Sequence, residues 1–314
     1  MIENGNRRLI KAIKSLLYED AFSKIIVKVN QMADSNLILN RIFSRNLLKA
    51  LLCQKNDAKR VYRNVLKKYL DSFENKTNKE LIEEIYQTLE KKYRNEYFYK
   101  NVLLEQLVFK FHNPKTTIAL TEIPVSKSIA DFILINGKAT VYEIKTDLDN
   151  FDRLDSQLVN YYKAFDNVCV VVSENNLPII KKKLLNKKIG ICYISQEGNL
   201  KSYRKPKPYK EQLDLEIMFK ILRKYEYEGI ISKYYDLPNV SQFKYYTACK
   251  RLFRKIPLNR VYKDFKEQLK QRNQTDIDLM SSLPKALTSV VYFSGFKTKE
   301  FSILRKFLDK KYGG

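Results

Sequence analysis

Two acidic residues and a lysine near the middle of the chain have the types and spacing of a metal-dependent hydrolytic site. Asp131 lies on one apolar segment, and Glu143-Ile144-Lys145 lies on the next. Side chains alternate across a strand, so Glu143 and Lys145 share one face. Carboxylate oxygens are the ligands that Mg²⁺ prefers, and a bound divalent ion activates water. The spacing therefore predicts a site that holds Mg²⁺ or Mn²⁺, with Lys145 beside it.

Short apolar segments rich in β-branched residues predict the strands that would position this site. They cover residues 118–125, 129–136, 139–146 and 168–173. The turn at Asn136-Gly137 joins the second and third segments as a hairpin, which places Asp131 nearly opposite Glu143. Helices are predicted over 93–111, 153–165 and 177–185, and a hairpin over 190–195 and 199–203. This order of elements is typical of a mixed α/β sheet.

The rest of the chain predicts helices on both sides of this α/β region. Apolar residues recur at helical spacing in residues 9–17, 47–52, 59–73, 79–92, 213–222, 240–253, 259–272 and 298–311. A basic segment with two prolines, Arg204–Pro208, separates the α/β region from the second helical region. We therefore expect an N-terminal helical region over 1–92, a core over 93–206 and a C-terminal helical region over 207–314.

The charge of the chain predicts a polyanionic partner. Lysine and arginine total 59 against 35 acidic residues, which gives a formal net charge of +24. Such a field attracts polyanions, with nucleic acid the leading candidate. Lys127, Lys250, Arg251 and Tyr161 are the candidate contact residues. A lysine-rich composition with solvated surfaces is the alternative interpretation.

Several other classes of chemistry lack their residues in this sequence. The four cysteines form no CxxC pair, and His112 is the only histidine, which excludes zinc ribbons and histidine-based triads. No phosphate-binding GxxxxGK[ST] motif occurs, which excludes that type of ATP-driven motor. No apolar run reaches membrane-spanning length, so we expect a cytoplasmic protein without a membrane partner.

The candidate site resembles that of the PD-(D/E)XK superfamily, the restriction-endonuclease-like nucleases, including stand-alone bacterial and phage members. The resemblance rests on Asp131, Glu143-Ile144-Lys145 and, on the following helix, Gln157 and Tyr161. It covers about residues 94–206 and agrees with the predicted order of helix, three strands, helix and strand. Ala130 stands where the family name has proline.

The resemblance assigns a role to each matching residue. It implies that Asp131, Glu143 and the Ile144 carbonyl are metal ligands, that Lys145 is the catalytic lysine and that Gln157 supports the site. The superfamily often adds a glutamate from the first helix. Glu96 is the candidate, and Glu105 is the alternative.

Two functions other than a nuclease stay open. One is a nucleic-acid-binding protein on an inactive nuclease fold, and the other is a protein-interaction module, for example in phage defence. The complete Asp131, Glu143, Lys145 and Gln157 set favours the enzyme, because an inactive fold is expected to have lost one of them. As a nuclease of this kind, the protein is expected to act on DNA rather than RNA. The resemblance also suggests a homodimer, and the helical flanks are candidates for contact with a protein partner.

Overall fold

The computed structural model describes residue 39 and residues 41–272 and 275–313, which belong to two compact units. The first unit, Met1–Phe73, contains α2 (Arg45–Leu52) and α3 (Asn56–Tyr69), both at predicted positions. Each is amphipathic and buries its apolar side chains at helical spacing. The helix predicted over residues 9–17 lies outside the described residues.

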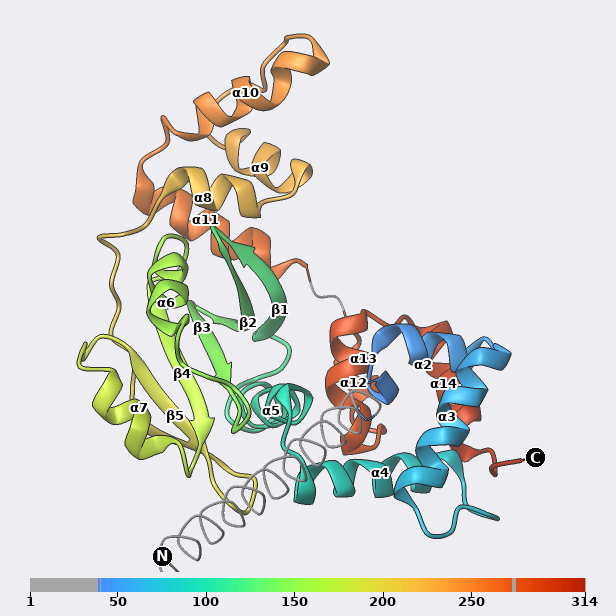
Figure 1. Ribbon diagram of the computed structural model, residues 1–314. Helices are drawn as coiled ribbons and strands as arrows, with labels where there is room; N and C mark the ends of the chain where they lie inside the picture. The colour runs from blue at the N-terminus through green and yellow to red at the C-terminus, as the bar shows by residue number, and fades with distance from the viewer. Residues whose placement is uncertain (1–38, 40, 273–274, 314) are drawn as a thin grey trace, which may run out of the picture. The chain divides into compact units, whose positions relative to one another are not determined.

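The second unit, Glu74–Gly314, contains a six-stranded sheet in the order β1-β2-β3-β4-β5-β6 (Figure 1). The strands are β1 (Ile118–Val125), β2 (Ser128–Asn136), β3 (Lys138–Lys145), β4 (Asn167–Ser173), β5 (Gly190–Ile194) and β6 (Leu200–Arg204). The pairs β3–β4 and β4–β5 are parallel, and the other neighbours are antiparallel. The predicted mixed α/β sheet and its strand positions are confirmed.

Helices connect the parallel strands and cover one face of the sheet. After β3 comes α6 (Leu154–Tyr162), and after β4 comes α7 (Leu177–Lys183). All seven residues of β4 are buried, as expected for a parallel strand covered on both faces. Val141 of β3 belongs to the same buried cluster as Leu158 and Tyr161 of α6. This packing fixes the face of β3 that also carries Glu143 and Lys145.

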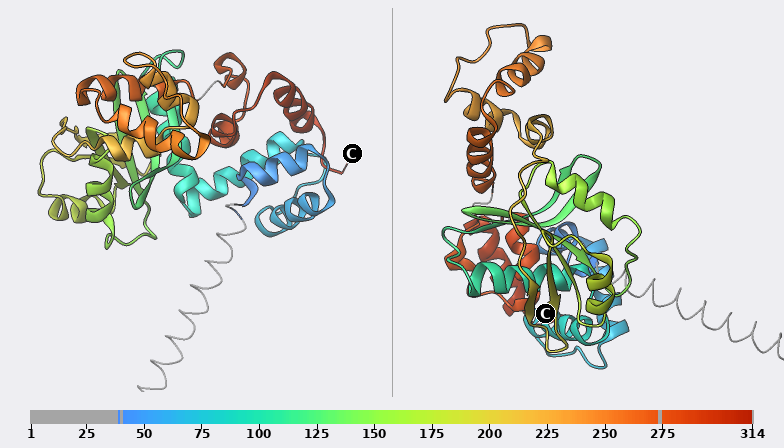
Figure 2. Two further views of the ribbon diagram at one scale, coloured as in Figure 1. Left: turned by 90° about the horizontal axis from the view of Figure 1, so that it is seen from above. Right: turned by 90° about the vertical axis from the view of Figure 1, so that its left-hand side faces the viewer.

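The helices α8 to α11 extend this core beyond the sheet. They span Leu215–Ile221, Lys224–Ile231, Gln242–Phe253 and Leu258–Lys270. Their buried side chains, such as Phe219, Phe253 and Phe265, join the cluster that includes the sheet residues. In Figures 1 and 2, α10 lies at the far end of this group from the sheet. The Arg204–Pro208 segment therefore separates two stretches of sequence that share one core.

The C-terminal residues return to the helices that precede the sheet. They form α12 (Ile277–Met280), η2 (Lys285–Leu287), α13 (Thr288–Ser294) and α14 (Thr298–Asp309), and they pack near α4 (Asn78–Lys92) and α5 (Glu96–Leu103). The buried amide of Asn101 donates to the Lys285 carbonyl at 2.6 Å and accepts from the Ser289 N–H at 2.8 Å. Phe293 of α13 packs edge-on against Phe132, on the face of β2 opposite Ile133.

The predicted helix over residues 93–111 is confirmed in position but changes character along its length. The α-helical part, α5, ends at Leu103, and a π-helix, η1, continues from Leu104 to Lys110. A π-helix rotates the following side chains relative to α-helical spacing. Glu96 and Glu105, the two candidate acids, therefore lie on segments of different geometry.

Candidate active site

The hairpin of β2 and β3 brings Asp131 and Glu143 side by side. Pairing runs from Asn136–Lys138 at the turn to Phe132–Tyr142, so the next opposite pair is Asp131 and Glu143. At this point the hydrogen bond from β3 goes to a side chain of β2 instead of its backbone, because Asp131 Oδ2 accepts the Ile144 N–H at 2.8 Å. This bond fixes the Asp131 carboxylate at the place where the two strands separate.

Glu143 is buried and held between two side chains. It is 1% exposed, its Oε1 lies 2.9 Å from Lys145 Nζ, and its Oε2 accepts the Tyr161 hydroxyl at 2.5 Å. The same hydroxyl lies 2.7 Å from the Ile129 carbonyl. Burial and the Glu143 charge raise the pKa of Tyr161, so the phenol keeps its proton as a donor. A carboxylate oxygen can accept a hydrogen bond and still bind a cation with its other lone pair.

The Asp131 carboxyl is in an unfavourable place for a negative charge. Burial, and then the carboxylates of Glu143 and Glu96, raise its pKa to about 8. The Ile144 N–H and the Lys100 ammonium oppose the increase and do not cancel it. A divalent cation at Asp131 would restore the ionised form, so this electrostatic arrangement fits a metal ligand.

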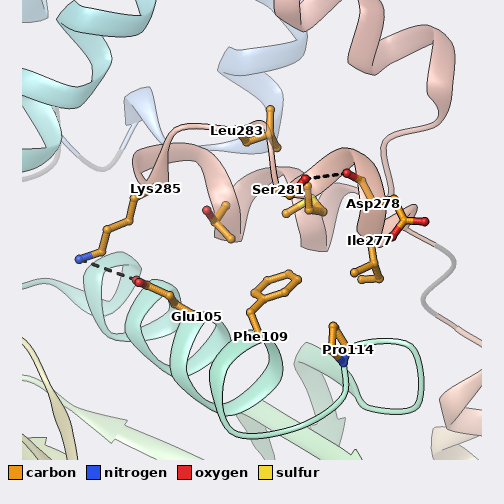
Figure 3. Close-up of a pocket in the computed structure, with 10 residues that line it drawn as sticks. Glu105, Phe109, Pro114, Ile277, Asp278, Ser281, Leu283 and Lys285 are labelled. Carbon is orange, nitrogen blue, oxygen red and sulfur yellow. Dashed lines mark hydrogen bonds and ion pairs between the residues drawn. The ribbon is translucent and has the colours of Figure 1, made fainter.

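Glu96 lies near the site and Glu105 does not. Asn95 caps α5 by accepting the Phe98 N–H at 3.0 Å, which places Glu96 in the first turn, where it acts on Asp131. Glu105 instead pairs with Lys285 at 3.7 Å and lines a separate cavity of about 520 Å³ (Figure 3). Of the two candidate acids, Glu96 is the one that the structure brings to Asp131.

Gln157 of α6 has an unsatisfied acceptor. The side chain is half-buried beside the Tyr161 hydroxyl, whose pKa it lowers slightly against the larger effect of burial. Its Oε1 is buried and accepts no hydrogen bond from any residue that the structure describes. Leaving such an atom unpaired costs about 1–3 kcal/mol, so a water or substrate group that reaches this oxygen would gain a hydrogen bond.

Two further charged residues, Lys100 and Glu122, lie at the site, and the sequence had not singled out Lys100. Lys100, one turn after Glu96, lies 2.7 Å from Glu96 Oε1 and 3.2 Å from Glu122 Oε1. Glu122 of β1 has φ of 56°, an uncommon left-handed conformation for a residue with a side chain. The i, i+4 spacing of Glu96 and Lys100 was the available sequence signal, but such pairs are common on helix surfaces.

The candidate nucleic-acid contacts are scattered. Lys127 is exposed in the turn before β2, and Arg251 is exposed on α10. Lys250 is bound to Glu216 at 2.7 Å. Tyr161 is completely buried, so its ring cannot stack on a base. Its hydroxyl instead donates a hydrogen bond to Glu143, which supports the position of that carboxylate.

Asp131 and Glu143 suit an ion that takes few ligands from the protein. In the part of the chain that the structure describes, no three His, Cys, Asp or Glu side chains meet as a ready metal-binding group. Mg²⁺ commonly takes one or two carboxylates and keeps water or substrate oxygens as its other ligands. Asp131 and Glu143 meet that requirement, and the Ile144 carbonyl stays a predicted third ligand.

Comparison with known proteins gives a family for the chain. The family model of bacteriophage P4 protein cII matches residues 89–289, which include the whole sheet and every residue of the candidate site. The chain belongs to this P4 cII family. Curated proteins and solved structures gave no match. None of the helices described for this family member is long and apolar enough to cross a membrane.

We predict that Asp131→Asn stabilises the metal-free protein more at high pH than at low pH. The raised pKa means that folding retains a proton that the unfolded chain loses, so wild-type stability falls as pH rises from about 4 through 8. Asparagine keeps the acceptor for Ile144 and removes this dependence. The gain in unfolding free energy over wild type should grow by about 3–4 kcal/mol between pH 5 and pH 8.

Chemical denaturation in EDTA at the two pH values measures this difference. Asp152→Asn, which changes an exposed carboxylate on the adjacent loop, is the matched control and should show little dependence on pH. An Asp131→Asn gain that is equal at both pH values would contradict the electrostatic description of the site.

Proposed function

We propose that this P4 cII family member is a metal-dependent nuclease that hydrolyses phosphodiester bonds in DNA, on a core like that of the restriction endonucleases. The observation that carries the proposal is the adjacency of Asp131 and Glu143, with Lys145 bound to Glu143. Glu143 is buried, and burial and the neighbouring carboxylates raise the pKa of Asp131 to about 8. Perturbed acids of this kind are concentrated in functional sites.

Each residue has a defined part in the proposed reaction. Asp131 and Glu143 would hold Mg²⁺ or Mn²⁺, which when bound lowers the pKa of water and offsets charge on phosphate oxygens. The Lys145 ammonium lies 2.9 Å from Glu143 Oε1. There it would orient the attacking water and stabilise the negative charge that develops on the phosphate. Gln157 accepts a hydrogen bond from that water or from substrate through its unpaired Oε1.

The chemical outcome would be simple hydrolysis. Water adds to phosphorus, the bond from phosphorus to one ester oxygen breaks, and the released oxygen gains a proton. Tyr161 takes no proton in this scheme, because its raised pKa keeps it neutral. Its hydroxyl donates a hydrogen bond to Glu143 Oε2, which holds the Glu143 carboxylate in place.

A protein-interaction or nucleic-acid-binding module on an inactive nuclease fold is the second candidate. It is favoured by exposed apolar side chains between α9 and α10 and on α10. These include Leu237, Val240 and Phe243, the last of which is 95% exposed. Exposed apolar patches are typical of interaction sites. The family description names a bacteriophage protein, which agrees with a role in phage or mobile-element biology for either candidate.

We predict that Glu143→Gln and Lys145→Met each lower cleavage at least about 100-fold, because each removes charge from the reacting centre. The measurement is hydrolysis of plasmid, linear DNA, single-stranded DNA and RNA with Mg²⁺, Mn²⁺ or EDTA. Lys138→Met changes an exposed lysine at the other end of β3 and should keep wild-type activity. Cleavage that persists in EDTA, or in both site variants, would overturn the proposal. Absence of cleavage on every substrate would favour the second candidate.

We predict that DNA binding is governed by phosphate contacts and weakens steeply with salt. For duplex DNA, log K falls with log salt at about −0.9 per phosphate contact. Lys127→Ala and Arg251→Ala should each reduce the magnitude of that slope by about 1. Fluorescence anisotropy in EDTA measures binding without cleavage, and Lys306→Ala, an exposed change on α14, is the control. A flat salt response would exclude a phosphate-dominated interface.

A further inference from the structure

Lys100 is a buried cation among the carboxylates of the candidate site. Its side chain is 10% exposed, although lysine is seldom buried without a partner. The ammonium lies between Glu96, one helical turn earlier, and Glu122 of the facing strand, at 2.7 and 3.2 Å. It is also close enough to Asp131 to act on that carboxyl. Lys100 therefore links the carboxylates of Glu96 and Glu122, whose side chains are 54% and 72% exposed, and it lies beside Asp131.

The backbone of β1 departs from ordinary strand geometry at one of these acids. Thr121 pairs with Phe132 and Ile123 pairs with Ala130, so the register is the same on both sides of Glu122. Only the residue between them, Glu122, adopts the left-handed conformation. Strained backbone of this kind is concentrated at functional sites. Here it occurs at the residue whose carboxylate is bound to Lys100.

The net charge of the site equals the charge that one divalent cation would neutralise. The ionisable groups are the carboxylates of Glu96, Glu122, Asp131 and Glu143 and the ammonium groups of Lys100 and Lys145. Four negative and two positive charges leave two negative charges when all are ionised. Lys145 is bound to Glu143 and Lys100 is bound to Glu96 and Glu122. Among the described residues, Asp131 is therefore the one of these four acids that forms no ion pair with an ammonium group.

We infer that Lys100 is a tethered cation that takes the place of a second metal ion, so that the site binds one divalent ion. This inference rests on the proposed metal-dependent function and names its stoichiometry. Glu96 and Glu122 are then ligands of the Lys100 ammonium and do not bind the metal. Lys100 acts as a positioning residue, because it holds these two carboxylates away from the ion at Asp131 and Glu143.

The test is the number of Mn²⁺ ions bound, counted by electron paramagnetic resonance with the full chain and no substrate. Wild type should bind one ion. Lys100→Met frees two carboxylates and should bind two. The double variant Lys100→Met/Glu122→Gln removes one of these ligands and should return to one. Lys76→Met breaks a lysine–glutamate pair elsewhere, with Glu84 at 2.9 Å, and should keep one ion.

The outcomes separate this inference from the proposed function. One ion in both wild type and folded Lys100→Met overturns the inference and leaves the nuclease proposal intact. Two ions in wild type also overturn it. No ion in wild type overturns the metal-dependent function itself.

A second variant keeps the inference testable if Lys100→Met does not fold. Glu96→Gln should change the Mn²⁺ dissociation constant by less than about threefold, since Lys100 and not the ion binds that carboxylate. Glu143→Gln should abolish binding. Loss of the ion in Glu96→Gln would show that Glu96 is a metal ligand and would overturn the inference.

Discussion

The buried carboxylate of Glu143 is the constraint on which the rest of the site depends. An isolated carboxylate in the centre of a sheet is very costly, so it must be paired and hydrogen-bonded. Lys145 supplies the charge from the same strand, and Tyr161 supplies the hydrogen bond from α6. The crossover from β3 through α6 to β4 is therefore needed for the site as well as for the core. It brings the Tyr161 hydroxyl, with Gln157 beside it, to Glu143 near the end of β3.

The Asp131 carboxyl is also largely buried, but burial there leaves its negative charge uncompensated. Burial, and then the carboxylates of Glu143 and Glu96, raise its pKa, and the hydrogen bond from the Ile144 N–H and the charge of Lys100 do not offset this increase. The site is therefore deficient in positive charge, and the packing around it maintains this deficiency. Functional sites commonly keep such locally unfavourable arrangements at a cost in stability.

Much of the α/β core could be predicted from the sequence because its signals are local. The Asn136-Gly137 turn fixes the hairpin register, and alternation along β3 puts Glu143 and Lys145 on one face. The strand positions followed from short β-branched runs between turns. The helices α9, α12 and α13 were missed, since they are short and their apolar residues face several neighbours at once.

The parts of the site that were missed depend on tertiary packing. Lys100 becomes significant only when α5 lies beside β1, and no local pattern marks Glu122 as having a positive φ. Tyr161 was predicted as a contact for nucleic acid, but only its burial against Glu143 indicates a supporting role. The choice between Glu96 and Glu105 likewise required tertiary contacts, since Glu96 acts on Asp131 and Glu105 pairs with Lys285.

The proposed metal site is tested most directly by an anomalous difference map at the manganese edge from crystals soaked in MnCl₂. We predict one peak with carboxylate oxygens of Asp131 and Glu143 at about 2.0–2.3 Å, a range typical of small divalent ions, and with Lys100 still bound to Glu96. A map without a peak at these residues would contradict it. So would a peak centred on Glu96 and Glu122 with Lys100 displaced.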